Sequence, residues 1–124
     1  MNLHEGVTKA QLKMLNAICG DLSRQVIWHG ARLDKDDYRH MLSGTAAGWR
    51  PVPMIDQGDG RFGAILLGSS SLKLTKQQAQ DAITMGLAIG DDPSSQGLKA
   101  QPVRWSDAVL LGLGQNPNDL RDVA

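Results

Sequence analysis

The sequence predicts an α+β fold made mainly of helices, with one β-hairpin between the second helix and the third. In four segments, apolar residues recur at helical spacing, and residues that commonly cap helices precede each segment. Between two of these segments, proline and glycine flank two short apolar runs, a pattern typical of a hairpin. We therefore expect one domain over residues 1–114 and a mobile C-terminal tail over residues 115–124.

The first helix is expected to be long and amphipathic, from Thr8 to about Trp28. Thr8 and Gln11 have the spacing of a capping box, in which each side chain bonds the other residue's backbone N–H. Gly20 costs about 1 kcal/mol relative to alanine inside a helix, so we expect a close contact there. Gly30 can adopt the left-handed conformation that often ends a helix. The apolar face comprises Leu12, Leu15, Ile18, Cys19, Leu22 and Val26.

A second helix is expected after Asp34, a favourable N-cap residue. Asp36 and Asp37 then lie in its first turn, where the helix dipole favours anions. The segment 43–45, Ser-Gly-Thr, weakens the end of this helix. Its apolar stripe comprises Tyr38, Met41 and Leu42.

The hairpin is expected to pair a strand over Val52–Ile55 with one over Arg61–Leu67, through a turn at Gln57–Gly60. A third short strand at Leu72–Leu74 is an open alternative. Because two strands alone are marginal in water, they need a helix, another strand or a second chain to pack on.

The third helix is expected from Thr75, which begins a second capping box, to Ile89, with Gly90 ending it. Ser106 has the character of an N-cap for a short C-terminal helix from Asp107 to about Leu113.

The charges balance: 13 basic and 13 acidic side chains give a formal net charge of +0. This excludes a strongly basic, histone-like coat protein but not a local basic face. The single cysteine, Cys19, cannot form an intrachain disulfide and is interpreted as a core residue. We expect a cytoplasmic protein, because the N-terminus lacks an apolar signal sequence and no apolar run reaches about 18 residues.

A narrow basic stripe is predicted on the first helix, where five residues fall within about 80° of one another around the helix axis. It can contact phosphates or be an ordinary solvated face, and spacing alone favours the second. The tryptophans Trp28, Trp49 and Trp105 each lie near a cation or an imidazole, which suits stacking on unpaired bases, although core packing is the commoner role. The stripe comprises Lys9, Lys13, Asn16, Gly20 and Arg24.

Enzyme chemistry has weak support. Asp34, Asp36 and Asp37 could together bind a divalent cation for nuclease chemistry, but helix capping explains them more simply. Three scattered histidines and one cysteine match neither a zinc spacing nor a catalytic triad. We therefore expect no enzyme, metal or cofactor, and keep the metal-dependent nuclease as an alternative.

The segment Gln11–Gly30 resembles the central helix of the NinB (Orf) recombination proteins of lambdoid phages. The resemblance is carried by Gly20-Asp21, by Ser23-Arg24-Gln25-Val26 and by Trp28-His29-Gly30, and Leu33-Asp34 matches the family's next positions. Two later blocks occur in the family's order. They are the strand pair around Val52-Pro53 and Phe62–Gly68, followed by Ser69–Ser71, and the motif Val103-Arg104-Trp105-Ser106-Asp107. A β-rich segment precedes the helix in that family, whereas a short polar leader precedes Thr8 here, so the resemblance is to a short form.

The resemblance implies an accessory factor in phage recombination that binds single-stranded DNA as a homodimer. It also implies that the protein works with the host single-stranded-DNA-binding protein to load the recombinase, without a cofactor. The DNA-binding residues expected on the matched block are Lys13, Arg24, Gln25, Trp28 and His29. The charge pattern adds Lys9, Arg32 and Arg50.

The alternative is a protein-interaction module that docks on a host factor, for example as an inhibitor of a defence or recombination enzyme. The zero net charge and the acidic tail favour it.

Overall fold

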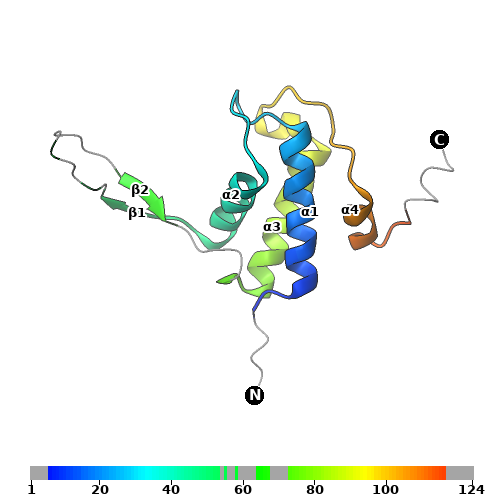
Figure 1. The fold of residues 1–124 in the computed structure, drawn as a ribbon, viewed down its shortest axis with the longest axis horizontal. Helices are drawn as coiled ribbons and strands as arrows, with labels where there is room; N and C mark the ends of the chain where they lie inside the picture. The colour runs from blue at the N-terminus through cyan, green and yellow to red at the C-terminus, as the bar shows by residue number, and fades with distance from the viewer. Residues whose placement is uncertain (1–5, 54, 56–57, 59–63, 68–72, 117–124) are drawn as a thin grey trace, which may run out of the picture.

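The computed structural model describes residues 6–53, 55, 58, 64–67 and 73–116, and the structural findings refer to these residues. It confirms the expected α+β fold with mostly helices (Figure 1). The elements in chain order are α1 (Lys9–Gln25), α2 (Lys35–Ala47), β1 (Arg50–Pro53), β2 (Ala64–Leu67), α3 (Lys76–Asp91), a 3₁₀ helix η2 (Pro93–Gln96) and α4 (Asp107–Gly112). Residues 117–124, most of the expected tail, lie outside the described part.

Three helices pack against one another, with α1 and α3 side by side and parallel (Figure 1). The side chain of Gln11 ties their starts together, since its Nε2 donates to the carbonyl oxygen of Lys76 at 3.0 Å. Both helices begin with the predicted capping box, built by Thr8 with Gln11 and by Thr75 with Gln78. In α2, Asp34 and Asp37 form a third capping box.

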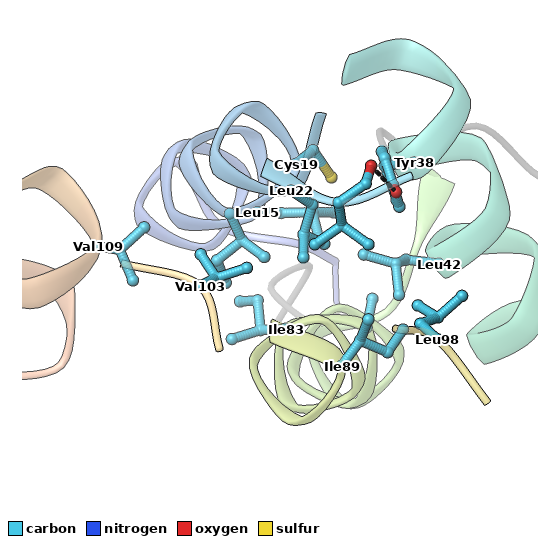
Figure 2. Close-up of a cluster of buried hydrophobic side chains, with 13 residues drawn as sticks. Leu15, Cys19, Leu22, Tyr38, Leu42, Ile83, Ile89, Leu98, Val103 and Val109 are labelled. Atoms are coloured by element: carbon cyan, nitrogen blue, oxygen red, sulfur yellow. Dashed lines mark hydrogen bonds between the residues drawn. The ribbon is translucent and has the colours of Figure 1, made fainter. Parts of the chain in front are cut away.

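The core lies between these helices and reaches α4 and the preceding segment (Figure 2). It contains most of the apolar face predicted for α1, and Tyr38 and Leu42 from the stripe predicted for α2. The Tyr38 hydroxyl donates to the carbonyl oxygen of Val26 at 3.0 Å, which satisfies its one polar group inside the core. The core cluster comprises Leu15, Ile18, Cys19, Leu22, Val26, Tyr38, Leu42, Ala82, Ile83, Ile89, Leu98, Val103 and Val109.

Helix α1 ends at Gln25, before the position predicted near Trp28, and Val26 is already extended. The chain then turns tightly: the backbone N–H of Trp28 donates to the carbonyl of Ala31 at 2.9 Å, and that of Ala31 to the carbonyl of Trp28 at 2.8 Å. His29 and Gly30 between them have φ values of 47° and 85°, as a type I′ turn requires. The positive φ of Gly30 therefore serves this turn and not a helix cap.

Two glycines predicted to weaken or end helices instead lie inside them. Gly44 is part of α2 and Gly90 part of α3. A Cβ added at Gly44 would overlap the indole of Trp49, and one at Gly90 the indole of Trp105. Both positions thus allow a tryptophan to approach the helix backbone closely.

The hairpin extends to one side of the helices (Figure 1). Strand β1 begins earlier than predicted and pairs antiparallel with β2, Arg50 opposite Leu67 and Pro53 opposite Ala64. Prolines are tolerated because neither strand of a two-stranded sheet has a neighbour on its outer edge. Gly58 has a φ of 84°, in keeping with the predicted turn.

The rest of that turn and residues 61–63 and 69–71 lie outside the described residues, as does Leu72 of the optional third strand. Of that strand, the described Lys73 and Leu74 are not in a strand. The carbonyl of Leu74 accepts instead from the backbone N–H of Val7 at 2.9 Å.

Candidate nucleic-acid interface

The predicted basic stripe lies on the part of α1 between α2 and α4; we call it the α1 strip and define it by Lys9, Lys13, Asn16, Gly20 and Arg24. On the α2 side, Nη1 of Arg39 donates to Oδ1 of Asn16 at 3.1 Å. On the other side, Lys13 lines a hollow with Ala108 and Leu111 of α4. The strip therefore has a helix on either side; its three cations are exposed, Asn16 is half-buried and Gly20 is buried.

Arg24 is the most constrained cation of the strip. Its guanidinium pairs with the carboxylate of Asp21, one turn earlier on α1. Asp21 is 1 % exposed, whereas the Arg24 side chain is 65 % exposed. The guanidinium also lies over Gly20, where an added Cβ would be 3.3 Å from Nη1, so Gly20 provides the close contact expected from the sequence. The charge of Arg24 is thus locally balanced by a buried carboxylate.

Lys9 and Lys13 are different, because both are exposed and neither has an ion pair within the described part of the chain. They are the strip's unbalanced positive charges. Arg32 is also exposed, in the segment between α1 and α2. Arg50 opens β1, and its side chain is outside what the structure describes.

Gln25 contacts the C-terminal segment through both ends of its amide. Its Nε2 donates to the carbonyl oxygen of Arg104, and its Oε1 accepts from the backbone N–H of the same residue, each at 2.9 Å. A glutamine held in this way has little left to offer a DNA base. The sequence predicted a DNA contact for Gln25. In the structure, its side chain links the end of α1 to the segment before α4 through two hydrogen bonds.

Asp21 makes a second link to the same segment, because its Oδ2 accepts from the backbone N–H of Ser106 at 2.8 Å. Ser106 is the N-cap of α4, yet its own side chain makes no capping bond. The indole Nε1 of Trp105 donates to Oδ1 of Asp91 at the end of α3, at 2.8 Å. Two blocks that carried the family resemblance, 20–26 and 103–107, are therefore joined in space. The sequence offered no signal for this link.

The three tryptophans are all partly packed. Trp28 is half-buried against the core and lines an apolar hollow of about 230 Å³ with Met41 and Met85. Trp49 is 36 % exposed and lies over Gly44. Trp105 is half-buried. Of the three, Trp49 is the most exposed, and Trp28 and Trp105 are half-buried.

His29 is exposed, and its ring meets the ring of Trp28 edge-on, with centroids 5.0 Å apart and planes at 84°. It lines an open hollow of about 510 Å³ at the C-terminal end of α1. We call this the terminal hollow, lined by Gln25, Ile27, His29, Gly30, Gly97, Leu98, Lys99 and Ala100.

The carboxylates proposed for a nuclease have structural partners. Oδ1 of Asp34 accepts from the N–H of Asp37 at 2.8 Å, Oδ2 of Asp37 accepts from the N–H of Asp34 at 3.0 Å, and Asp36 pairs with Arg39 at 2.8 Å. Within the described ranges, no group of three or more histidine, cysteine, aspartate or glutamate side chains is arranged to hold a metal ion.

Cys19 lies in the core, as predicted, and burial raises the pKa of its thiol to about 12. A thiol this hard to ionise is a poor nucleophile. Separately, among the described helices none combines the length and apolar character that a membrane span requires.

Comparison with known proteins shows the family. The family model described as NinB protein matches residues 4–94. The ninB protein of Salmonella phage P22 is 26 % identical over 103 residues, covering 83 % of this chain and 63 % of that protein. The corresponding protein of Escherichia phage lambda is also 26 % identical, with 62 % of its length covered.

A solved NinB structure superposes with a TM-score of 0.60 at 27 % identity, covering 81 % of this chain and 66 % of the other. The chain thus spans less than two thirds of the length of the relatives that it matches. These matches confirm the family expected from Gln11–Gly30, and the chain belongs to the NinB family of lambdoid phage proteins.

Proposed function

We propose that this chain binds single-stranded DNA as a non-enzymatic accessory factor in phage recombination and helps to load the recombinase. It acts as a homodimer in the host cytoplasm, with the host single-stranded-DNA-binding protein as a further partner and without a cofactor. Membership of the NinB family supports the phage context. The observation that carries the DNA-binding proposal is the pair of exposed, unbalanced lysines Lys9 and Lys13 on the α1 strip.

The mechanism is neutralisation of backbone phosphates. Each phosphate that a cation contacts releases condensed counterions. For a single strand, the slope of the logarithm of the binding constant against the logarithm of the salt concentration is therefore about −0.7 per contact. Lys9 and Lys13 are the main contacts. Arg24 adds a third at a fixed position, weakened by its pairing with Asp21. Arg32 and Arg50 lie beyond the strip as outer contacts.

The contacts differ from those expected from the sequence in two places. Gln25 is given no role in base recognition, because its amide is engaged by two bonds to Arg104. Trp28 packs on the core and orients His29 instead of stacking on a base itself. We assign base contact to His29, which is exposed just after the end of α1.

The test is a titration of a labelled oligothymidylate of about 20 nucleotides, followed by fluorescence anisotropy over a range of salt concentrations. The double variant Lys9→Glu/Lys13→Glu is expected to weaken binding. It should also reduce the slope of log binding constant against log salt concentration by about 1.4, because two contacts are lost. The matched control is Lys73→Glu/Lys76→Glu, the same charge change on two exposed lysines, one just before α3 and one at its first residue. Equal affinity loss in the two double variants would show that the strip is not the binding face.

Absence of binding by the unaltered protein at low salt would favour the alternative, docking on a host protein. For that role α4 and its C-cap residue offer an apolar surface, since Leu111 is 62 % and Leu113 41 % exposed.

A further inference from the structure

The terminal hollow is formed where two turns of the chain meet. One is the turn at His29-Gly30, and the other comes after η2, where Gly97 has a φ of 74°. The His29 ring reaches across, because its Cε1 lies 3.7 Å from where a Cβ on Gly97 would be. A Cβ at Gly97 would touch the ring at ordinary van der Waals distance, and the positive φ is what favours glycine at this position.

The His29 ring is held in place but its polar atoms are free. Its edge contact with Trp28 is backed by the core on which Trp28 packs. Neither ring nitrogen has a hydrogen-bond partner within the described part of the chain. A residue other than glycine at positive φ carries a local backbone cost, and such outliers are concentrated at functional sites.

Apart from the Gln25 amide, the rest of the lining is apolar with one cation. Ile27 is 50 % exposed, and Leu98 and Ala100 continue the apolar surface. Lys99 is exposed and has no ion pair among the described residues. Among the described residues that line the hollow, none is acidic. This combination favours a ligand with one flat apolar part and one negative charge.

We propose that the terminal hollow takes a single unpaired nucleotide of the bound strand. The base lies against Ile27 and the His29 ring, whose nitrogens bond the edge of the base, and the phosphate pairs with Lys99. The hollow opens at the C-terminal end of the helix that carries the α1 strip, about 24 Å along the axis from Lys9. The proposal rests on the proposed DNA binding and adds base contact to a phosphate-binding strip.

The first test compares two strands with the same phosphates, an oligothymidylate and an abasic oligonucleotide of equal length. The unaltered protein is expected to bind the base-bearing strand roughly fivefold or more tightly. His29→Asn removes the ring, while asparagine tolerates the positive φ, and it should bring this ratio close to one. Lys9→Glu/Lys13→Glu should weaken binding of both strands and keep the ratio. A ratio near one in the unaltered protein overturns the proposal.

The second test does not depend on the strip. Thymidine 5′-monophosphate is titrated into the ¹⁵N-labelled protein, and amide shifts are expected at Gly30, Gly97 and Lys99. Lys99→Gln, a conservative change at an exposed loop position, should weaken this response several-fold, and Lys76→Gln should leave it unchanged. Shifts confined to other regions overturn the proposal. Shifts here without binding of either long strand would refute the proposed function and leave the hollow as a nucleotide site.

Discussion

The carboxylate of Asp21 on α1 bonds the N-cap residue of α4, 85 positions later, by accepting the backbone N–H of Ser106 at 2.8 Å. The same carboxylate pairs with Arg24 one turn away. A buried charge is tolerated when it is both paired and hydrogen-bonded, and Asp21 meets both conditions. Arg24 therefore has a structural role before it has any role in binding DNA.

Replacing Asp21 by alanine is expected to destabilise the protein by about 1–3 kcal/mol. The change leaves the Ser106 N–H without its acceptor and removes an N-terminal cap from α4. Urea unfolding followed by circular dichroism measures the loss. The matched control is Asp36→Ala, which removes an exposed ion pair to Arg39 and should cost no more than about 0.5 kcal/mol. Equal losses in the two variants would contradict a capping role for Asp21.

Gln25→Ala is expected to loosen the C-terminal segment, with any change in DNA affinity following from that loosening. The variant loses two hydrogen bonds to the backbone of Arg104, worth about 1–2 kcal/mol together at this exposed site. Amide hydrogen exchange should speed up over residues 104–112. Gln80→Ala, which loses only a long bond to Thr84, serves as the control. A clear drop in affinity with unchanged exchange would return Gln25 to the DNA-binding set.

Gly90→Ala is expected to destabilise the protein by about 1–3 kcal/mol, although alanine favours helix formation by about 1 kcal/mol. The added Cβ overlaps the Trp105 indole, so the indole must move and its bond to Asp91 breaks. Tryptophan fluorescence measures the displacement of the Trp105 indole, and thermal unfolding measures the loss of stability. Gly20→Ala is the contrast: its Cβ meets only the flexible end of Arg24, so stability should change little or rise. The close-approach explanation is wrong if the two variants behave alike.

Stability is expected to fall as the pH rises above about 9. Burial raises the pKa of the Cys19 thiol from its ordinary 9.0 to about 12. Between these values the unfolded chain loses the thiol proton and the folded chain keeps it, so the unfolding free energy decreases with pH. Cys19→Ala should show a shallower decline over this range. Part of the decline should remain in this variant, because burial also raises the pKa of Tyr38. Identical slopes for the two proteins would show that Cys19 is not the group responsible.

The helices were predictable because their signals are local. Capping boxes at Thr8 and Thr75 span four residues each, and both form as expected. The apolar face of α1 became the core because a 3.6-residue period places those side chains on one side of the helix. The family could be predicted for the same reason, since Gln11–Gly30 is one continuous segment.

What the sequence left open depends on contacts between distant residues. The sequence showed Gly90 as a helix end, and only the position of Trp105 shows why α3 continues through it. The sequence showed Gln25 and Arg24 as polar residues fit for DNA, and only the bonds to Arg104 and Asp21 assign them to the fold. Such bonds join residues up to 85 positions apart and leave no spacing pattern in the chain.

For the segment Gln11–Gly30, then, the order of residues was enough to predict the helix, its buried face and its family. The packed fold settles which of its polar residues are free to meet a ligand, leaving Lys13 and His29 free and engaging Arg24 and Gln25. The physical reason is that hydrogen-bond and ion-pair partners decide the role of a polar side chain, and those partners come together only when the chain folds.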